Sequence, residues 1–435
     1  VLEFGQQDTS APASGAEQTL LAQGLLAINA PLQGTLISLD VTPGQHVARG
    51  AQLAVFEAMK MEHILSAEAA GVVHAIEAQT GDTLWEGQRV MALAPAAQDD
   101  IAETATTAVD LDHIRDDLGE ILARRALTRD QQRPHAVARR RKTAQRTVWE
   151  NVDDLVDQDT FVEYGPLTLA AQRRRRELDD LISRSPADGL ITGVGRVNGD
   201  EFDDPHARTA VMAYDYTVFA GTQGVHNHWK TDRIVDVAER GRMPFVLFGE
   251  GGGGRPGESD YGGFVGQNTF QHFGKLSGHV PIVGIVSGRC FAGNAALMGC
   301  CDVIIATANT NIGMGGPAMV EGGGLGVFAP EDIGPMRDQV PNGVVDIAVD
   351  DEREAVRVAK QYLGYFQGRL RQWEAPEQRS MRSIIPENRL RVYEIRDVIN
   401  TLADIGSVLE LRAGFGRTMV TAFIRVEGQP VGILA

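Results

Sequence analysis

The chain has 435 residues, of which 43% are hydrophobic, and its formal net charge is -17. This length accommodates about two to four domains. So acidic a protein repels nucleic acid and anionic membranes, although it can still contain a locally basic pocket for an anionic ligand. The three cysteines, two of them adjacent, predict no disulfide framework and favour the cytoplasm, and no apolar run is long enough to span a bilayer.

Composition divides the chain into four segments. The first residue is Val1 rather than Met, which suggests a piece of a longer polypeptide. Residues 1–27 are expected to be a linker or the tail of an upstream domain. Residues 28–95 have the short apolar runs and turn residues of an all-β domain. The small and polar residues 96–110 predict a second linker, and residues 111–435 form the remaining domain.

An internal repeat with a period of 37 residues runs through the all-β segment. Gly34 matches Gly71, and the later glycines and the apolar positions match with the same period. Two copies of one unit predict two similar β-layers, with glycines in tight turns that need a positive φ. The link between the copies, residues 57–62, must then be an exposed hairpin with Lys60 at its tip.

Lys60 lies between Met59 and Met61 in the run Glu-Ala-Met-Lys-Met-Glu. Most lysines are simply solvated, but that interpretation leaves two methionines at an exposed turn unexplained. The motif and its surroundings resemble the biotinyl (biotin carboxyl carrier) domain, a flattened β-barrel or hammerhead fold. A lipoyl domain shares that fold but typically has Asp-Lys-Ala at the tip. The resemblance implies biotin as a covalent cofactor attached to Lys60 by a biotin protein ligase.

Strand-like and helix-like runs alternate in residues 111–435, which predicts an α/β fold with βαβ-like units. Expected strands are 209–215, 244–250, 281–287 and 302–307, and a helix is expected over 228–241. Three strands end in glycine-rich turns, at 250–255, 288–296 and 313–317. Backbone amides at such turns can hold a developing oxyanion without any side chain. Tight structural turns remain the alternative.

Neither a Ser/His/Asp set nor a metal-ligand pattern is recognisable. His226 and His228 are expected to pack or to lie in loops, Cys290 to be a small packing residue, and no metal site is predicted. The basic runs 139–142 and 173–176 are interpreted as solvated faces, with contact to the phosphates of CoA as the alternative.

Residues 137–435 resemble the N-terminal half of an acyl-CoA carboxylase carboxyltransferase, which has a crotonase-like (ββα spiral) α/β fold. The resemblance rests on five stretches in the family's order: 161–165, 187–199, 251–255, 290–296 and 342–346. The turn at 291–294 and residues 322–328 are most similar to single-chain carboxylases, including long-chain acyl-CoA carboxylases.

The resemblance implies a biotin-dependent acyl-CoA carboxylation. Backbone amides of Gly293 and Asn294 would hold the thioester oxygen as an enolate, and biotin on Lys60 would bring the CO₂ that the enolate takes up at its α-carbon. The family commonly has Gly-Gly at this turn, so the Asn294 side chain is expected beside the acyl group. Contacts to the acyl-CoA are implied for Gly251, Gly252, Gly253, Ala292, Gly315 and Gly316.

The implied partners extend beyond the chain. They are the C-terminal half of the transferase, a biotin carboxylase that uses ATP, Mg²⁺ and bicarbonate, and further copies in a homo-oligomer. Two other functions stay open. One is a biotin-dependent acyl-CoA decarboxylase, and the other is an inactive carrier or scaffold module.

Overall fold

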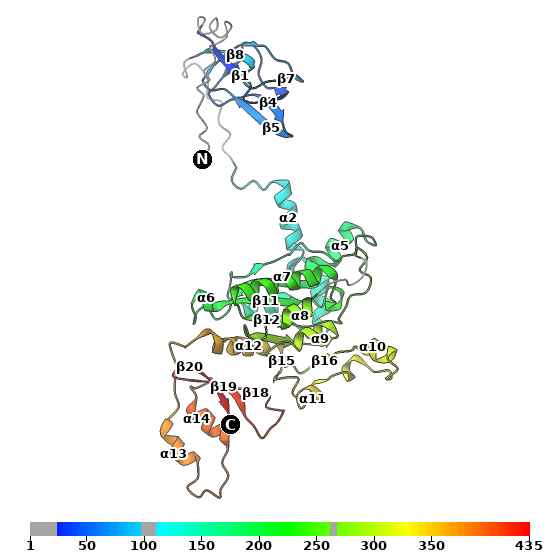
Figure 1. The fold of residues 1–435 in the computed structure, drawn as a ribbon, viewed down its shortest axis with the longest axis vertical. Helices are drawn as coiled ribbons and strands as arrows, with labels where there is room; N and C mark the ends of the chain where they lie inside the picture. The colour runs from blue at the N-terminus through cyan, green and yellow to red at the C-terminus, as the bar shows by residue number, and fades with distance from the viewer. Residues whose placement is uncertain (1–23, 97–109, 262–267) are drawn as a thin grey trace, which may run out of the picture. The chain divides into compact units, whose positions relative to one another are not determined.

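The computed structural model describes residues 24–96, 110–261 and 268–435. Contacts divide the chain into two units between His113 and Ile114. The first unit is blue and the second runs from cyan to red in Figure 1. The predicted linkers, residues 1–27 and 96–110, lie almost entirely outside the described residues.

Within residues 24–96, eight strands form two four-stranded sheets, in the orders β1-β8-β6-β3 and β5-β4-β2-β7. The period of 37 is confirmed, because β2, β3 and β4 correspond to β6, β7 and β8 in opposite sheets. Gly44, Gly50, Gly81 and Gly87 have positive φ, as the repeat predicts. Gly34 and Gly71 do not, so the prediction is wrong for that pair; there a Cβ atom would lie within 2.7 Å of a backbone oxygen on a neighbouring strand. Apolar residues between the sheets form one core. The strands are β1 (Leu26–Asn29), β2 (Gly34–Leu39), β3 (His46–Val47), β4 (Gln52–Ala58), β5 (Met61–Ser66), β6 (Gly71–Ile76), β7 (Thr83–Leu84) and β8 (Arg89–Pro95).

The predicted hairpin joins β4 to β5. Ala58 and Met61 are the last paired residues, so Met59 and Lys60 form a two-residue turn. Their φ values are 53° and 65°, which place both in the left-handed region. Positive φ at both positions is the geometry of a type I′ turn, whose twist matches that of the flanking strands.

A seven-stranded sheet organises the second unit, in the order β17-β15-β13-β12-β11-β10-β9. The five strands from β11 to β17 run parallel, and β9 and β10 are antiparallel additions at one edge. The α/β fold expected from the sequence is therefore confirmed. The strands are β9 (Val162–Glu163), β10 (Leu190–Arg196), β11 (Arg208–Tyr214), β12 (Phe245–Phe248), β13 (Ile282–Val286), β15 (Val303–Thr307) and β17 (Ile347–Val349).

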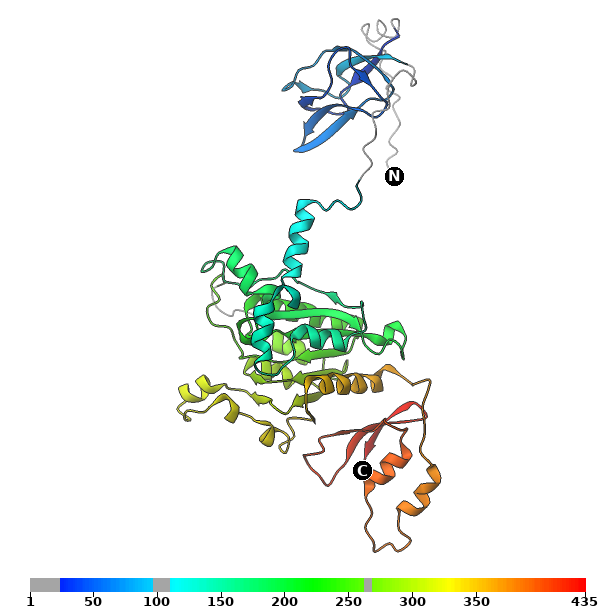
Figure 2. The ribbon, with the colours of Figure 1, turned by 180° about the vertical axis from the view of Figure 1, so that it is seen from behind.

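Helices cover both faces of this sheet. Alternate residues of β12 point to opposite sides: Val246 and Phe248 join the core under α4 (Val148–Leu155) and α12 (Glu352–Gln367), and Phe245 and Leu247 join the other core. That second core includes residues of α7 (Val225–Gly241), α8 (Thr269–Gly274) and α9 (Gly293–Met298). Figure 2 shows the same layers from behind. Both faces of the parallel strands are buried, as is usual for such sheets.

A strand–strand–helix unit occurs twice in succession along the chain. β13 is followed by β14 (Arg289–Phe291) and α9, and β15 is followed by β16 (Asn311–Gly313) and α10 (Pro317–Gly322). β13 and β15 are neighbours in the large sheet, whereas β14 and β16 pair with each other in a separate parallel ladder. All three predicted glycine-rich turns therefore follow strands.

The remaining elements flank this framework. The C-terminal strands form a three-stranded antiparallel sheet in the order β18-β19-β20. No helix in the described ranges is long and apolar enough to cross a membrane. The other elements are α2 (Asp116–Ala126), α3 (Pro134–Arg141), α5 (Leu178–Arg184), α6 (Asp204–Ala207), α11 (Met336–Gln339), α13 (Met381–Ile384), α14 (Ile395–Leu402), β18 (Leu409–Leu411), β19 (Thr421–Val426) and β20 (Gln429–Leu434).

Substitutions at two adjacent residues of β2, one buried and one exposed, test which face of the strand packs in the core of the first unit. Leu36 is fully buried, whereas its neighbour Ile37 is 40% exposed. Leu36→Ala is expected to destabilise this unit by about 2–5 kcal/mol because it leaves a cavity. Ile37→Ala is the matched control and should change stability by no more than about 0.5 kcal/mol. Hydrogen exchange of peptides from residues 26–95 measures both, and equal deprotection by the two variants would contradict the assigned faces.

Candidate functional site

The turn between β14 and α9 carries the predicted oxyanion amides. Ala292 precedes the helix with φ 50° and ψ -120°, which turns the chain sharply so that Gly293 and Asn294 are the first two helical residues. Among the described residues, neither backbone amide has a hydrogen-bond acceptor. First-turn amides lack intrahelical partners, so both are free to receive a ligand oxygen.

The glycine-rich loop after β12 lies directly against this turn. The Gly251 amide donates to the Arg289 carbonyl at 2.8 Å, and the Phe291 amide donates back to the Gly251 carbonyl at 2.9 Å. Gly252 and Gly254 are exposed, and their amides have no acceptor in the described part of the chain. Unpaired amides from two loops therefore lie on adjoining segments.

The Asn294 side chain differs from expectation. It is fully buried, its Oδ1 accepts a hydrogen bond from the Gly253 amide at 2.9 Å, and its Nδ2 donates to the Gly221 carbonyl at 3.2 Å. The expectation of an amide group beside the acyl chain is therefore wrong, because both polar ends of the side chain are used within the protein. Asn294 ties the two loops together, which a glycine at this position cannot do.

Glycine is required at three positions by close approach. A Cβ atom on Gly253 would lie 2.5 Å from the Cβ of Ala292. A Cβ atom on Gly293 would overlap the side-chain oxygen of Gln223, and one on Gly251 would overlap the Gly221 carbonyl. These predicted site residues are thus brought together, and their close packing is the reason for the glycines.

A buried ion pair anchors the start of the glycine-rich loop. The Arg140 guanidinium binds both carboxylate oxygens of Glu250, at 2.8 and 2.6 Å. Glu250 directly precedes Gly251, and burial raises the pKa of its carboxyl group while the contact with Arg140 opposes that shift. The interpretation of run 139–142 as a solvated face is wrong for Arg140, whose side chain is 7% exposed.

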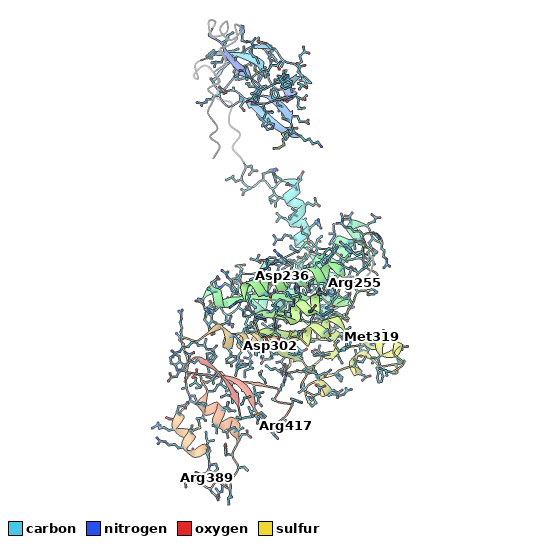
Figure 3. All side chains as sticks on the ribbon, in the orientation of Figure 1. Asp236, Arg255, Asp302, Met319, Arg389 and Arg417 are labelled. Atoms are coloured by element: carbon cyan, nitrogen blue, oxygen red, sulfur yellow. The ribbon has the colours of Figure 1, made fainter. Side chains whose placement is uncertain are left out.

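A second buried ion pair anchors the end of the same loop. Arg255, labelled in Figure 3, forms an ion pair with Asp188 and also donates to the Thr222 carbonyl at 2.9 Å. Asp188 is fully buried, which raises the pKa of its carboxyl group against the lowering effect of Arg255. The four glycines are thus held between two arginine–carboxylate pairs. The sequence pattern missed this arrangement, although charged residues directly flank the glycine run.

The other predicted residues divide between the two units. Gly316 packs beside Phe291 of the oxyanion turn, where an added Cβ would be 3.5 Å from the ring, and Gly315 is its half-buried neighbour. Lys60 is exposed at its hairpin tip, and the flanking Met59 is 97% exposed. Lys60 belongs to the first unit, and Gly315 and Gly316 belong to the second.

Cys290 is a packing residue, and the two histidines lie on a helix. Cys290 is fully buried in the core, and burial raises the pKa of its thiol, so it is held protonated and packs as a small residue. His226 and His228 lie on α7 rather than in a loop, and the imidazole of His226 bonds the Leu169 carbonyl at 2.7 Å. The described residues contain no group of side chains arranged to hold a metal ion.

Comparison with known proteins assigns the second unit to a family. The family model described as the carboxyl transferase domain matches residues 139–435. The chain belongs to the carboxyl transferase domain family. A second model, described as biotin-requiring enzyme, matches residues 27–93, which include Lys60.

Similar proteins span more than this chain. A solved single-chain, multi-domain long-chain acyl-CoA carboxylase is 50% identical with a TM-score of 0.73, and the match covers 94% of this chain but 40% of that one. The 12S subunit of methylmalonyl-CoA carboxyltransferase from Propionibacterium freudenreichii is 29% identical over 69% of this chain and 57% of that subunit. An uncharacterized carboxylase of Bacillus subtilis is 29% identical over 58% of this chain and 50% of that protein. The chain therefore spans about half the length of the curated relatives it matches.

The Arg140–Glu250 pair is expected to contribute strongly to the stability of the second unit. Arg140→Ala should lower the free energy of unfolding by about 3–5 kcal/mol, because it leaves Glu250 buried without its partner. The double change Arg140→Met with Glu250→Leu should cost less, since it removes both charges and retains volume. Urea unfolding of the full chain, followed by hydrogen exchange in the second unit, measures both.

A surface pair supplies the control for this prediction. Arg357 contacts Glu354 with side chains that are 59% and 42% exposed. Arg357→Ala should change the free energy of unfolding by about 1 kcal/mol or less. Equal costs for Arg140→Ala and Arg357→Ala would contradict a structural role for the buried pair.

Proposed function

We propose that this chain supplies the biotin carrier and the acyl-CoA-binding half of the carboxyltransferase in a biotin-dependent acyl-CoA carboxylase. The observation that carries the proposal is the joint presence of an exposed lysine in a match to biotin-requiring enzymes and free backbone amides in a match to carboxyl transferases. The 50% identity to a long-chain acyl-CoA carboxylase favours a long-chain acyl-CoA substrate.

We also propose a specific fold for each of the two units. A crotonase-like ββα spiral is supported by the succession β13-β14-α9 and β15-β16-α10, whose second strands pair in their own ladder. A flattened β-barrel of the biotinyl type is supported by two four-stranded sheets with a repeat of 37 residues. The domain limits 28–95 and 111–435 are proposed on the same ground.

The hairpin of the first unit fits a biotin attached to Lys60. The turn contains two residues only, so the lysine side chain extends from a tip that another enzyme's active site can approach. The neighbouring methionines are exposed and leave the tip unobstructed. When bound, biotin supplies a carrier for activated CO₂. The part played by this chain is to present the lysine on a defined turn.

The oxyanion turn would act on the acyl-CoA. In the proposed step the α-carbon would give its proton to a base, supplied by the biotin ring after release of CO₂, and negative charge would develop on the thioester oxygen. The α-carbon of that enolate would then bond to the CO₂. The Gly293 and Asn294 amides donate hydrogen bonds to that oxygen, and their positions are fixed before the charge appears. Gly251, Gly252, Gly253, Ala292, Gly315 and Gly316 are proposed to contact the acyl-CoA around this point. The Asn294 side chain holds the Gly253 amide in place and does not touch the substrate.

The proposal requires partners beyond the chain. These are a biotin carboxylase, the C-terminal half of the transferase, a biotin protein ligase and, by analogy with the hexameric 12S relative, further copies. The free thiols of Cys290, Cys300 and Cys301 support a cytoplasmic location. Carboxylation of acyl-CoAs that depends on ATP and bicarbonate separates a carboxylase from a decarboxylase or an inactive carrier.

Biotinylation is expected to occur at Lys60 and to be lost in Lys60→Arg. Arginine retains the charge and the length of the side chain but lacks the primary amine that forms the amide bond. Avidin blotting of the full chain, expressed with a biotin protein ligase, measures the modification. Lys142→Arg, a change at another exposed lysine, is the control and should blot normally. A normal signal from Lys60→Arg would place biotin elsewhere.

Gly293→Ala is expected to reduce acyl-CoA carboxylation by about 100-fold or more in an assembled enzyme that contains this chain, since losing one oxyanion donor has an effect of that size. The added methyl group overlaps Gln223 and must displace the turn. Gly299→Ala, at the other end of α9, has neighbours no closer than 3.5 Å and serves as the control. Carboxylation rates with bicarbonate label measure both, and a fully active Gly293→Ala enzyme would refute the assignment.

A further inference from the structure

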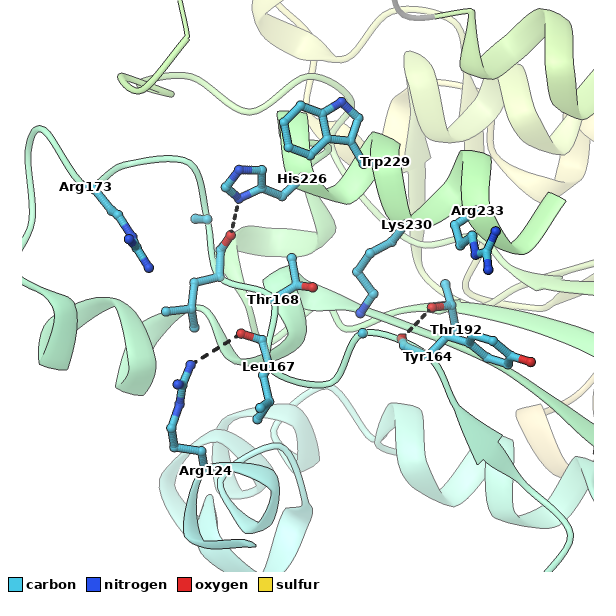
Figure 4. Close-up of a pocket in the computed structure, with 13 residues that line it drawn as sticks. Arg124, Tyr164, Leu167, Thr168, Arg173, Thr192, His226, Trp229, Lys230 and Arg233 are labelled. Atoms are coloured by element: carbon cyan, nitrogen blue, oxygen red, sulfur yellow. Dashed lines mark hydrogen bonds between the residues drawn. The ribbon is translucent and has the colours of Figure 1, made fainter. Parts of the chain in front are cut away.

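A pocket of about 540 Å³, which shares no lining residue with the oxyanion turn, lies between the first half of α7, strand β10 and the segment 164–173. Figure 4 shows the side chains that line it. Its volume falls within the range for small-molecule sites and far exceeds the space that a single ion or water needs. The sequence alone assigned none of these residues to a common site, although the stretches 161–165 and 187–199 include three of them and the expected helix 228–241 another three.

The charge of the pocket is opposite to that of the protein. Four cationic side chains line it: Arg124, Arg173, Lys230 and Arg233. None of the described residues that line it carries a carboxylate, although the chain has a net charge of -17. An ordinary surface region of so acidic a protein would contain carboxylates among its cations. A lining with cations and no carboxylate therefore indicates a site for an anion.

The two least committed cations are Arg173 and Arg233. No hydrogen bond or ion pair of either guanidinium occurs within the described part of the chain, whereas Arg124 donates to the Leu167 carbonyl at 3.4 Å. Arg233 lies one helical turn after Trp229 on α7, so both side chains extend from the same helix face. Guanidinium groups suit phosphate oxygens because they can donate two parallel hydrogen bonds.

Lys230 is the innermost cation. Its ammonium group donates to the Ala187 carbonyl at 2.9 Å and also to the Leu190 carbonyl, which fixes its position. Burial lowers the pKa of Lys230 to about 8, so the side chain is still mostly charged at neutral pH. Two carboxylates partly offset this shift: that of Glu163 on β9, which lines a different hollow, and that of the buried Asp188, which is paired with Arg255.

Aromatic rings form one side of the pocket. The centroids of His226 and Trp229 are 5.0 Å apart, and Tyr261 lies 5.2 Å from Trp229 in an edge-to-face arrangement. The hydrogen bond from His226 to Leu169 fixes one ring, and Trp229 is 49% exposed. In Figure 4 the His226 and Trp229 rings lie together above the cations. A half-exposed indole that contacts two other aromatic rings is a stacking surface for a planar base, an interaction of about 1–3 kcal/mol.

We propose that this pocket binds a phosphorylated adenine nucleotide, with the base on Trp229 and the phosphates between Arg173 and Arg233. A planar aromatic surface and two uncommitted guanidinium groups in one cavity fit this chemistry better than they fit a fatty acyl chain or bicarbonate. Two ligands have this chemistry: a free nucleotide, and the nucleotide end of a CoA ester. Only the second rests on the function proposed above.

Isothermal titration calorimetry of the full chain tests the pocket directly. Adenosine 3′,5′-bisphosphate and ADP are expected to bind, and adenosine and inorganic phosphate to bind at least tenfold more weakly. Arg173→Gln with Arg233→Gln should weaken nucleotide binding at least tenfold, and Trp229→Ala should weaken it by a similar factor. Arg240→Gln is the control, because Arg240 lies on the same helix and is 78% exposed.

Several outcomes overturn the proposal. They are dissociation constants weaker than about 1 mM for both nucleotides, equal affinity of the Arg240→Gln protein and the double variant, or phosphate binding as tight as nucleotide. Thermal unfolding at an unchanged temperature excludes misfolding of the variants as the cause.

Competition then identifies the source. If CoA displaces adenosine 3′,5′-bisphosphate, the double variant should also raise the KM for acyl-CoA in the assembled enzyme without lowering kcat. If CoA and the nucleotide bind together, the ligand is a free nucleotide. Because binding is measured without turnover, failure of the carboxylation experiments would leave this test intact.

Discussion

The candidate site depends on two buried arginine–carboxylate pairs that hold a run of four glycines between them. Glycines have no side chains to pack, and ordering each backbone residue costs about 1–2 kcal/mol. Arg140 fixes Glu250 at one end of the run, and Asp188 fixes Arg255 at the other. The ion pairs at its two ends hold the loop in place. The loop therefore needs no side chains of its own, and its backbone amides stay available to a ligand. A loop fixed by its own side chains would fill the space that a ligand needs.

Much of the fold could be predicted because its signals are local. The strands of the parallel sheet are apolar runs bounded by glycine or proline, and α7 has the apolar spacing of a helix packed on one face. The hairpin at Lys60 followed from a period of 37 residues, since a repeated unit fixes where its copies must join. The glycine turns could be placed after strands for the same reason, although their mutual contact could not.

What the sequence could not predict is pairing across long separations. Arg140 and Glu250 are 110 positions apart, and within an arginine-rich run one buried member looks like its solvated neighbours. The sequence places Asn294 in the oxyanion turn but does not show where its side chain points. That direction is set by hydrogen bonds to the backbone of Gly253 and Gly221, which are far away in the sequence. The basic pocket is invisible for the same reason, since its lining comes from segments between residues 124 and 233.

The turn at Met59 and Lys60 has a mechanical consequence. Left-handed backbone costs a residue with a Cβ atom about 1–2 kcal/mol, and neither position is glycine. The same Cβ atoms narrow the range of backbone angles that the turn can visit, so the tip behaves as a stiff pivot. A group joined to the lysine nitrogen would sweep only the volume that the side-chain torsions permit. Its search for a receiving site would then be a rotation about a short stalk rather than the wandering of a loose loop.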